Sequence, residues 1–420
     1  MTTNLHPNRI LQTVAGSAMA ISLIAGAQTP ATPMPASAAP TTLAAASTPT
    51  PAPTPAAQAP EAAPAAAPAA PPLKFPWKIG PMAVTGFIDG YYSYNYNQPT
   101  NSANGQINDL YNFDDKTDAV ELSAAKLTLN HDPAPFGAHF DFIYGRTNGL
   151  VSAGLQANYV EQAFLSLKPP KAKGFEADFG RFVTSAGAEV IEAKDNWNYS
   201  RSLLFSWAIP YTNFGLRTSM PVSKVETLGV QVVNGWNEVT KNNGWATIGI
   251  TSALTKTKYT WSANLYTGPE NALAGHGYRN LVDTTLLLTP STKFNAYINY
   301  DYGMNHDAKV KGVGDTLTNT WQGIAIAAHQ QVSGATAVAG RYEYFTDPNG
   351  FQTGTAQHLN EFTGTFEYKF SKKLPQALLS RAEYRHDQSD SPFFHKNATS
   401  MVDGQSTVTV GLILILAPHE

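Results

Sequence analysis

Acidic side chains recur at three-residue spacing in one stretch of this 420-residue chain. Glu189, Glu192 and Asp195 lie within residues 184–212, and Arg201 follows them in the same stretch. Carboxylates that face guanidinium groups across a gap create an electric field that orders polar solutes and sets an ion preference. Alternatively, the same carboxylates solvate the stretch or tie it to a neighbouring wall through salt bridges. The residues alone leave both interpretations open.

Arginines in extended segments are the candidate partners of these carboxylates. Arg381, Glu383 and Arg385 alternate with uncharged residues, which places all three on one face of a strand. In a transmembrane β-barrel a charged side chain facing lipid at mid-depth costs about 2–4 kcal/mol, so such groups are expected to face the lumen. The candidate wall residues are Arg181, Arg217, Arg341, Arg381, Glu383 and Arg385.

Other chemistry has weak support in the sequence. The ten His residues show no HxH or HExxH spacing, and Cys is absent, which excludes thiolate zinc sites and Cys nucleophiles. The Asn- and Asp-rich stretches 112–118 and 347–349 lack the spacing of a calcium-binding loop. We therefore expect no enzymatic activity, no cofactor and no metal site.

Composition narrows the class of protein further. There are 28 basic and 31 acidic residues and no basic block, so nucleic acid is not an expected partner. Charged residues make up 14% of the chain, against about 25% in an ordinary soluble domain. Only one N-terminal stretch approaches the apolar run of about 20 residues that a membrane-spanning helix needs. Few charges, many Tyr and Gly residues and no Cys are typical of an outer-membrane β-barrel.

From about residue 82 onward, strand-like segments follow one another. In several of them apolar and polar residues alternate at period two, as in 294–302 and 361–370. In a transmembrane barrel the apolar face meets lipid and the polar face lines the lumen. Sixteen strands are predicted: 82–97, 118–130, 137–146, 158–168, 174–183, 213–220, 225–236, 244–254, 257–267, 278–289, 292–303, 317–331, 335–346, 358–370, 377–387 and 405–416.

The connections between these strands alternate between short and long. A barrel with both termini in the periplasm needs an even strand count, short turns on one side and long loops on the other. The third long connection, 184–212, is the longest and is rich in aromatic residues. A barrel of sixteen strands is wide enough to hold a channel, so we expect this loop to fold into the lumen, by analogy with general porins.

The N-terminal part of the chain has a different character. Residues 1–27 combine a sparse basic start, an apolar run and small residues, which predicts a signal peptide. Residues 28–72 are almost wholly Ala, Pro, Thr and Ser, a composition that predicts an extended periplasmic linker. The barrel itself is assigned to residues 73–420.

Four pieces of the sequence carry a family resemblance. They are TGFIDGYYSYNYNQP at 85–99, GRFVTSAGAEVIEAKDNWNYSRSLLF at 180–205, the stretch from Pro210 to Arg217, and VQVVNGWN at 230–237. In these pieces the chain resembles the beta-barrel porin-2 (OmpL-like) proteins of Gram-negative bacteria. The second half of the barrel matches in pattern only. Where relatives more often have a His, near 211–214, this chain has Thr212 and Asn213, so its selectivity could differ.

The expected function is that of an outer-membrane porin: a water-filled channel for passive diffusion of small hydrophilic solutes and ions, constricted by loop 184–212. The alternatives are a channel specific for a sugar or another nutrient, and a plugged structural or adhesion barrel tethered to the cell wall. The expected partners are outer-membrane lipid and lipopolysaccharide, small hydrophilic solutes, two further copies in a homotrimer, and peptidoglycan through the linker. Both termini are expected in the periplasm of a Gram-negative bacterium.

Overall fold

The computed structural model describes residues 78–100, 106–152, 158–270, 277–306, 318–370 and 377–416. The predicted signal peptide (1–27) and linker (28–72) lie outside these residues. Among the described residues, no helix is long and apolar enough to cross a membrane.

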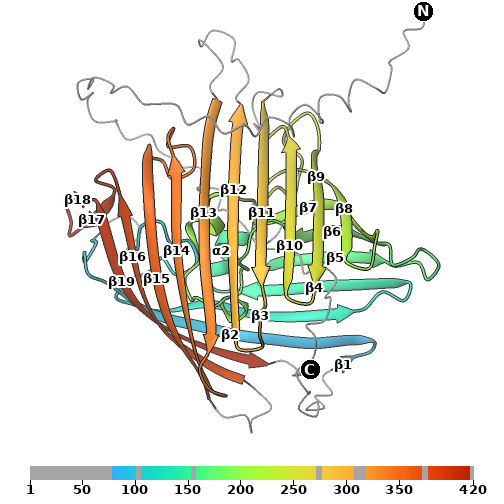
Figure 1. Cartoon of the computed structure of the whole chain (residues 1–420), viewed down its shortest axis with the longest axis horizontal. Helices are drawn as coiled ribbons and strands as arrows, with labels where there is room; N and C mark the ends of the chain where they lie inside the picture. Colours follow the sequence, from blue (N-terminus) through green and yellow to red (C-terminus); the bar gives the residue numbers. More distant parts are fainter. Residues whose placement is uncertain are drawn as a thin grey trace, which may run out of the picture. The chain divides into compact units, whose positions relative to one another are not determined.

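Sixteen antiparallel strands form a closed barrel (Figure 1). Each strand pairs with its neighbours in the chain, and the last strand pairs with the first, with Leu412 opposite Gly90. The sixteen strands are β2 (Met82–Asn95), β3 (Val120–His131), β4 (Phe136–Tyr144), β5 (Val160–Leu167), β6 (Glu176–Val183), β7 (Thr212–Pro221), β8 (Glu226–Val233), β9 (Thr247–Lys256), β10 (Tyr259–Gly268), β11 (Tyr278–Leu288), β12 (Phe294–His306), β13 (Thr318–Gln331), β14 (Thr336–Asp347), β15 (Gln357–Phe370), β16 (Ala377–Ser389) and β19 (Gly404–Leu416). The predicted fold class and strand count are confirmed.

Small elements complete the described chain. The two-residue strand β1 (Lys78–Ile79) pairs with the start of β2. The helix α2 (Arg146–Val151) follows β4. Strands β17 (Phe394–Lys396) and β18 (Ser400–Val402) form a separate hairpin, in a connection that the sequence predicts as a plain loop.

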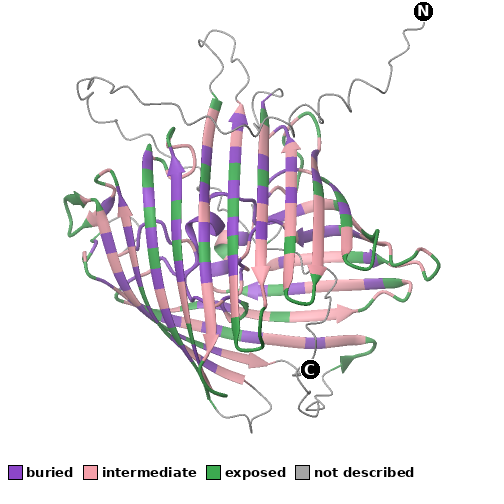
Figure 2. Cartoon of the chain, viewed as in Figure 1, coloured by how far each residue is buried: buried purple, intermediate pink, exposed green. Residues whose placement is uncertain are grey.

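Burial alternates along the strands in the sense expected of a membrane barrel. On β15, Phe362 and Phe366 are 55% and 48% exposed, whereas Glu361 and Thr363 are at most 1% exposed. Figure 2 shows the same alternation of buried and exposed residues along β12 and β15. Apolar side chains therefore cover the outside and polar side chains the inside, because the period of two places neighbours on opposite faces.

Strand boundaries differ from the predicted ones by a few residues. The turn between β9 and β10 lies at residues 257–258, two positions after the predicted turn at 255–256. The sequence reads Thr-Lys at both places, so the local pattern does not distinguish them. The inter-strand register decides, because it sets Tyr259 opposite Lys256.

Candidate functional site

The connection from β6 to β7 covers residues 184–211, and we call it the β6–β7 segment. It contains the short helices η2 (Ala193–Asp195) and α3 (Leu203–Trp207). The side chain of Ser202 accepts a hydrogen bond from the N–H of Phe205 at 2.9 Å. This cap satisfies one of the N–H groups that the first turn of α3 leaves without a helical partner.

Two glutamates of the barrel wall hold the backbone of this segment. Glu343 of β14 accepts hydrogen bonds from the N–H groups of Leu203 and Leu204, at 2.8 and 3.0 Å. Glu383 of β16 accepts from the N–H of Tyr199 and from the next N–H along the chain, at 2.5 and 2.9 Å. Hydrogen bonds to an ionised acceptor are stronger than neutral ones, so β14 and β16 position the segment.

The loop carboxylate Glu189 meets the wall arginine Arg341. Arg341 Nη1 lies 2.7 Å from Glu189 Oε1, and the hydroxyl of Tyr297 donates to the same oxygen at 3.1 Å. Arg341 also donates to Glu361 of β15, with a distance of 3.1 Å from Nε to Oε2. The side chains of Arg341 and Glu189 are 0% and 4% exposed, so Glu189 ties the segment to the wall.

The other two arginines of the predicted ladder also bind both the wall and the segment. Arg381 pairs with Glu367 at 2.8 Å and donates to the backbone oxygens of Ala193 and Asn198. Arg385 pairs with Asp387 at 2.7 Å. It also donates to the backbone oxygen of Arg201 at 2.7 Å.

The remaining predicted loop acids lie on another side of the segment. Glu192 forms an ion pair with Lys126 of β3. Lys126 also lies 2.8 Å from Asp141 of β4 and 2.6 Å from Glu161 of β5. Asp195 pairs with the neighbouring Lys194, and its side chain is 49% exposed. Of the predicted loop carboxylates, Asp195 is therefore the one most open to a solute.

The remaining predicted arginines do not pair with the loop acids. Arg201 donates to the backbone oxygens of Ile191 and Tyr199 and so braces the segment from within. Arg181 donates to the backbone oxygens of Val160 and Val151. Arg217 pairs with Asp178 of β6 at 2.7 Å and stacks over the rings of Phe164 and Phe182.

Sequence reasoning missed Lys126 and Glu343 as partners of the segment, and Glu361 as a partner of Arg341. The signal for Lys126 was present, because Lys126, Thr128 and Asn130 alternate with leucines along β3. The candidate set for the wall, however, contained only arginines as cations. No local pattern singled out Glu343 and Glu361 from the other inward carboxylates.

Apolar side chains of α3 pack against the barrel strands. Leu203 and Leu204 are fully buried in a cluster that includes Trp321 of β13 and Phe345 of β14. Trp321 Nε1 donates to the backbone oxygen of Ala208 at 2.9 Å. Hydrophobic contact thus reinforces the ion pairs that hold the segment.

Several carboxyl groups outside the strands have shifted pKa values, among them Asp114 and Glu192. Burial raises the pKa of Asp114, in the connection between β2 and β3, to about 7, although Arg201 acts in the opposite direction. Burial also acts to raise the pKa of Glu192, but the adjacent Lys126 ammonium lowers it below the ordinary value. No described group of three or more His, Asp or Glu side chains is arranged to hold a metal ion.

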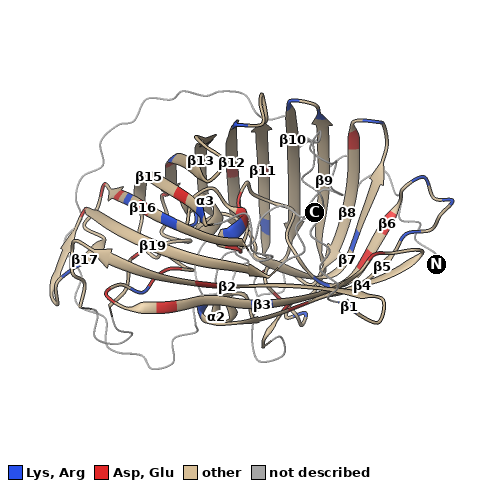
Figure 3. Cartoon of the chain, turned by 90° about the horizontal axis from the view of Figure 1, so that it is seen from below, with Lys and Arg blue, Asp and Glu red and all other residues tan. Residues whose placement is uncertain are grey.

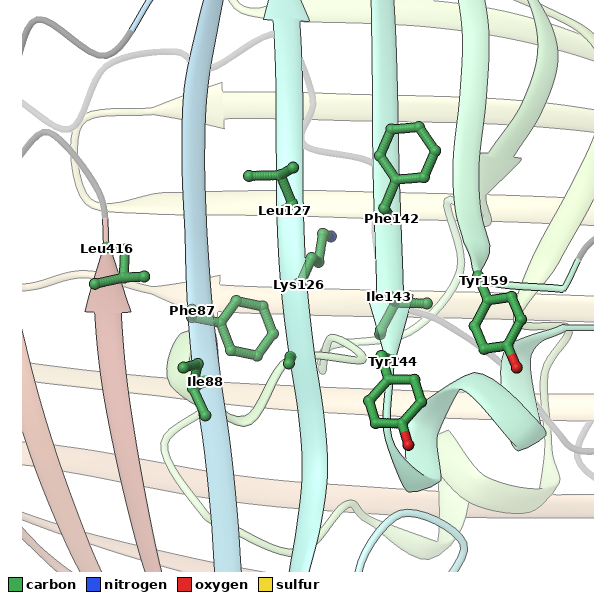
Figure 4. Close-up of a pocket in the computed structure, with 10 residues that line it drawn as sticks. Phe87, Ile88, Lys126, Leu127, Phe142, Ile143, Tyr144, Tyr159 and Leu416 are labelled. Carbon is green, nitrogen blue, oxygen red and sulfur yellow. The ribbon is translucent and has the colours of Figure 1, made fainter.

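A shallow apolar cavity of about 320 Å³ lies on the outer face of β2, β3 and β4 (Figure 4). Its exposed lining includes Ile88, Leu127, Phe142 and Tyr144. These side chains belong to the face that the alternation turns away from the interior. The lining also includes Lys126, which pairs with Glu192, so the cavity adjoins a contact of the β6–β7 segment.

A closed ring of sixteen antiparallel strands, apolar outside and charged inside, defines an outer-membrane-type β-barrel. Residues 81–416 match a family model described as "Putative beta-barrel porin-2, OmpL-like". The chain belongs to this porin family, and an outer-membrane location follows from the family and the fold. No curated protein matches the chain in sequence.

Solved porins share the fold at low sequence identity. The outer-membrane channel DcaP of Acinetobacter baumannii has a TM-score of 0.52 and 10% identity, with 79% of this chain and 96% of that chain covered. An anion-selective porin from Comamonas acidovorans has a TM-score of 0.52 and 13% identity, with coverages of 80% and 99%. The trimer form of OmpT from Vibrio cholerae has a TM-score of 0.50 and 13% identity, with coverages of 80% and 98%.

Proposed function

We propose that this chain forms a water-filled channel for passive diffusion of small hydrophilic solutes and ions, and that the β6–β7 segment folds into the lumen and narrows it. Membership of a porin family and the fold of the porin neighbours support the channel. Passive diffusion needs no chemical step and no cofactor. The activity is therefore transport and not catalysis.

The observation that carries the constriction is the spread of strands that the segment contacts. Its side chains and backbone bond to buried groups of β2, β12, β14 and β16: Asp89, Tyr297, Glu343 and Glu383. These groups lie on the face opposite the exposed apolar one. A segment that reaches four such strands of a closed barrel is best accommodated inside it.

The charges that a solute would meet are those left accessible on the segment. The side chains of Lys194 and Asp195 are 23% and 49% exposed, and Glu192 is 16% exposed. Arg217, on the wall, is 18% exposed. We propose that these groups, rather than the buried Arg341, Arg381 and Arg385, form the surface of the constriction.

Two alternatives rest on specific observations. A plugged structural barrel is favoured by the apolar cluster that joins Leu203 and Leu204 to Trp321. A nutrient-specific channel is favoured by Trp197, whose ring lies 5.1 Å from that of Tyr297 and 5.7 Å from that of His329. Aromatic faces of this kind bind the apolar faces of sugars.

The cellular context is part of the same proposal. We propose a signal peptide at 1–27, a periplasmic linker at 28–72 that reaches peptidoglycan, and both chain ends in the periplasm. We further propose a homotrimer, since the solved neighbours include a trimer form. The outer face would contact membrane lipid and lipopolysaccharide.

Single-channel current recording tests the proposed channel. We would extract the folded protein, verify folding by heat-modifiable gel mobility, and record single-channel currents in a planar lipid bilayer in KCl. Stable open steps are expected. Folded protein that gives no steps would overturn the diffusion channel and favour the plugged barrel.

A thiol probe tests the constriction separately, because the chain has no Cys of its own. In Asp195→Cys, a charged membrane-impermeant thiol reagent should lower the single-channel conductance by narrowing the pore. In Asp403→Cys, whose position is exposed between β18 and β19, the same reagent should leave conductance unchanged. Equal conductance before and after labelling of Asp195→Cys would place this residue outside the conducting path.

A further inference from the structure

Buried charge in the described part of the barrel is strongly unbalanced. Sixteen carboxylate residues are buried there, against five arginines. Twelve of these carboxylates and four of the arginines belong to barrel strands, and because the outer face of the strands is apolar, they lie on the interior side. Figure 3 shows acidic and basic positions together on the strands around α3. An interior with excess negative charge attracts cations and repels anions.

The arginines of β14 and β16 do not offset this excess as an anion-binding wall. Arg341 lies within 3.2 Å of three carboxylates, those of Glu189, Glu343 and Glu361. Arg381 and Arg385 each have a carboxylate partner, at 2.8 and 2.7 Å. Each guanidinium charge is thus matched by at least one buried negative charge, and the side chains are closed to solvent.

One pair of carboxylates has no such compensation. Asp283 of β11 and Asp301 of β12 are directly opposite in the antiparallel register, and both are fully buried. Asp283 accepts hydrogen bonds from the side-chain amides of Asn264 and Asn299, at 2.6 and 2.9 Å. No described cation pairs with Asp301, whose side-chain neighbours are the Asp283 carboxyl and the Asn299 amide. In the described chain, the side-chain donors to this pair are neutral amides.

The pair lies next to the start of the β6–β7 segment. The same Asn264 amide that bonds Asp283 also donates to the backbone oxygen of Ser185, at 2.8 Å. An ion that passes the segment on this side therefore passes close to the pair. The electric field of a buried charge reaches an ion across a layer of side chains, because the protein interior screens the charge less than water does.

We propose that the channel prefers cations, and that the Asp283–Asp301 pair sets this preference at the level of the β6–β7 segment. The inference rests on the proposed channel function and names the class of solute. It assigns the pair a role in selectivity through its field, without direct contact with the ion. The arginines of β14 and β16 take the structural role of holding the segment.

The experiment measures the reversal potential of single channels under a KCl gradient. The wild-type protein should show a reversal potential of the sign that marks potassium as more permeant than chloride. Two facing carboxyl groups share one proton, so the pair carries about one negative charge. The double variant Asp283→Asn/Asp301→Asn should therefore lower the ratio of potassium to chloride permeability by about fivefold, the size expected for one unit charge within about 8 Å of the ion path. The variant Asp403→Asn, which removes an exposed carboxylate outside the barrel strands, should keep the wild-type ratio.

The outcomes separate the two proposals. Folded protein without open steps would overturn both the channel and its preference. Open steps with a chloride preference, or with none, would overturn the inference and leave the channel intact. A cation preference that persists unchanged in a double variant shown to be folded by heat-modifiable mobility would remove the role of the pair. Uptake of an uncharged disaccharide in a liposome-swelling assay should be equal in the wild type and the double variant, and a loss in the variant would mean that the pair supports the segment's structure instead.

Discussion

Arg341 is surrounded by three buried carboxylates. It lies near Glu189, Glu343 and Glu361, which are all buried. Removing one partner from a buried ion pair costs more than the pair itself contributes, because the remaining charge has no solvation. Replacing Arg341 should therefore destabilise the protein by a measurable amount.

We expect Arg341→Met to lower the free energy of unfolding by about 3–5 kcal/mol, the usual cost of an uncompensated buried charge. Urea unfolding in detergent or lipid vesicles, followed by tryptophan fluorescence, measures the loss. The matched control is Arg217→Met, which removes a half-buried arginine with one carboxylate partner and should cost clearly less. Equal losses in the two variants would show that the cluster around Arg341 has no special role.

The shifted pKa of Asp114 predicts how its contribution to the stability of the folded protein changes with pH. Its pKa in the folded protein is raised from the ordinary value of 3.8 to about 7 by burial, so the folded state favours the neutral form. The stability contributed by this group is full below pH 4 and is lost as the pH rises through about 7. In Asp114→Asn the amide imitates the neutral acid and this loss should be absent.

The measurement is the difference in unfolding free energy between Asp114→Asn and the wild type, taken from pH 4 to pH 8. The difference should shift in favour of the variant as the pH rises. The control Asp118→Asn changes an exposed carboxylate of the same connection and should show no such shift. A difference between Asp114→Asn and the wild type that is constant with pH would contradict the assignment.

The position of the β6–β7 segment depends on a glycine in the last strand. A Cβ atom built on Gly411 of β19 would overlap the ring of Tyr199, whose hydroxyl donates to Asp89 of β2 at 2.8 Å. A methyl group at this position must therefore displace the segment. Overpacking of this kind costs about 1–3 kcal/mol.

We expect Gly411→Ala to destabilise the barrel by that amount and to change the single-channel conductance, because the segment moves. Gly364→Ala, on β15, is the matched control, since a Cβ there meets no atom within 4 Å. Both variants make the same chemical change within a strand. Unchanged conductance in Gly411→Ala, together with wild-type stability, would show that Tyr199 and the segment can shift without consequence.

The barrel as a whole is defined by its apolar outer face. Phe362 lies near the middle of β15 and is 55% exposed, so lipid would surround it. An arginine facing lipid near the bilayer midplane costs about 2–4 kcal/mol. We expect Phe362→Arg to lower the free energy of unfolding in lipid vesicles by this amount, whereas Phe362→Leu should have little effect. A smaller cost for the arginine would place this side of the barrel against protein rather than lipid.

Features that depend on residues close together along the chain could be predicted from the sequence. The alternation of apolar and polar residues has a period of two, so it identifies a strand and its two faces without knowledge of the partner strand. The spacing of turns and long connections gave the sixteen strands and their antiparallel order. The errors occurred where the local pattern is ambiguous, as in the repeated Thr-Lys between β9 and β10, or too short, as in β17 and β18.

Contacts across the barrel could not be predicted in this way. Glu189 and Arg341 are 152 positions apart, and any of several inward arginines satisfies the same local pattern. The sequence by itself determined the barrel, its two faces and the set of charges inside. Only the tertiary structure decided which charges meet, because closure of the barrel and the path of the β6–β7 segment bring distant strands together. It left Arg341, Arg381 and Arg385 matched by carboxylates, and Asp283 and Asp301 with no cationic partner among the described residues.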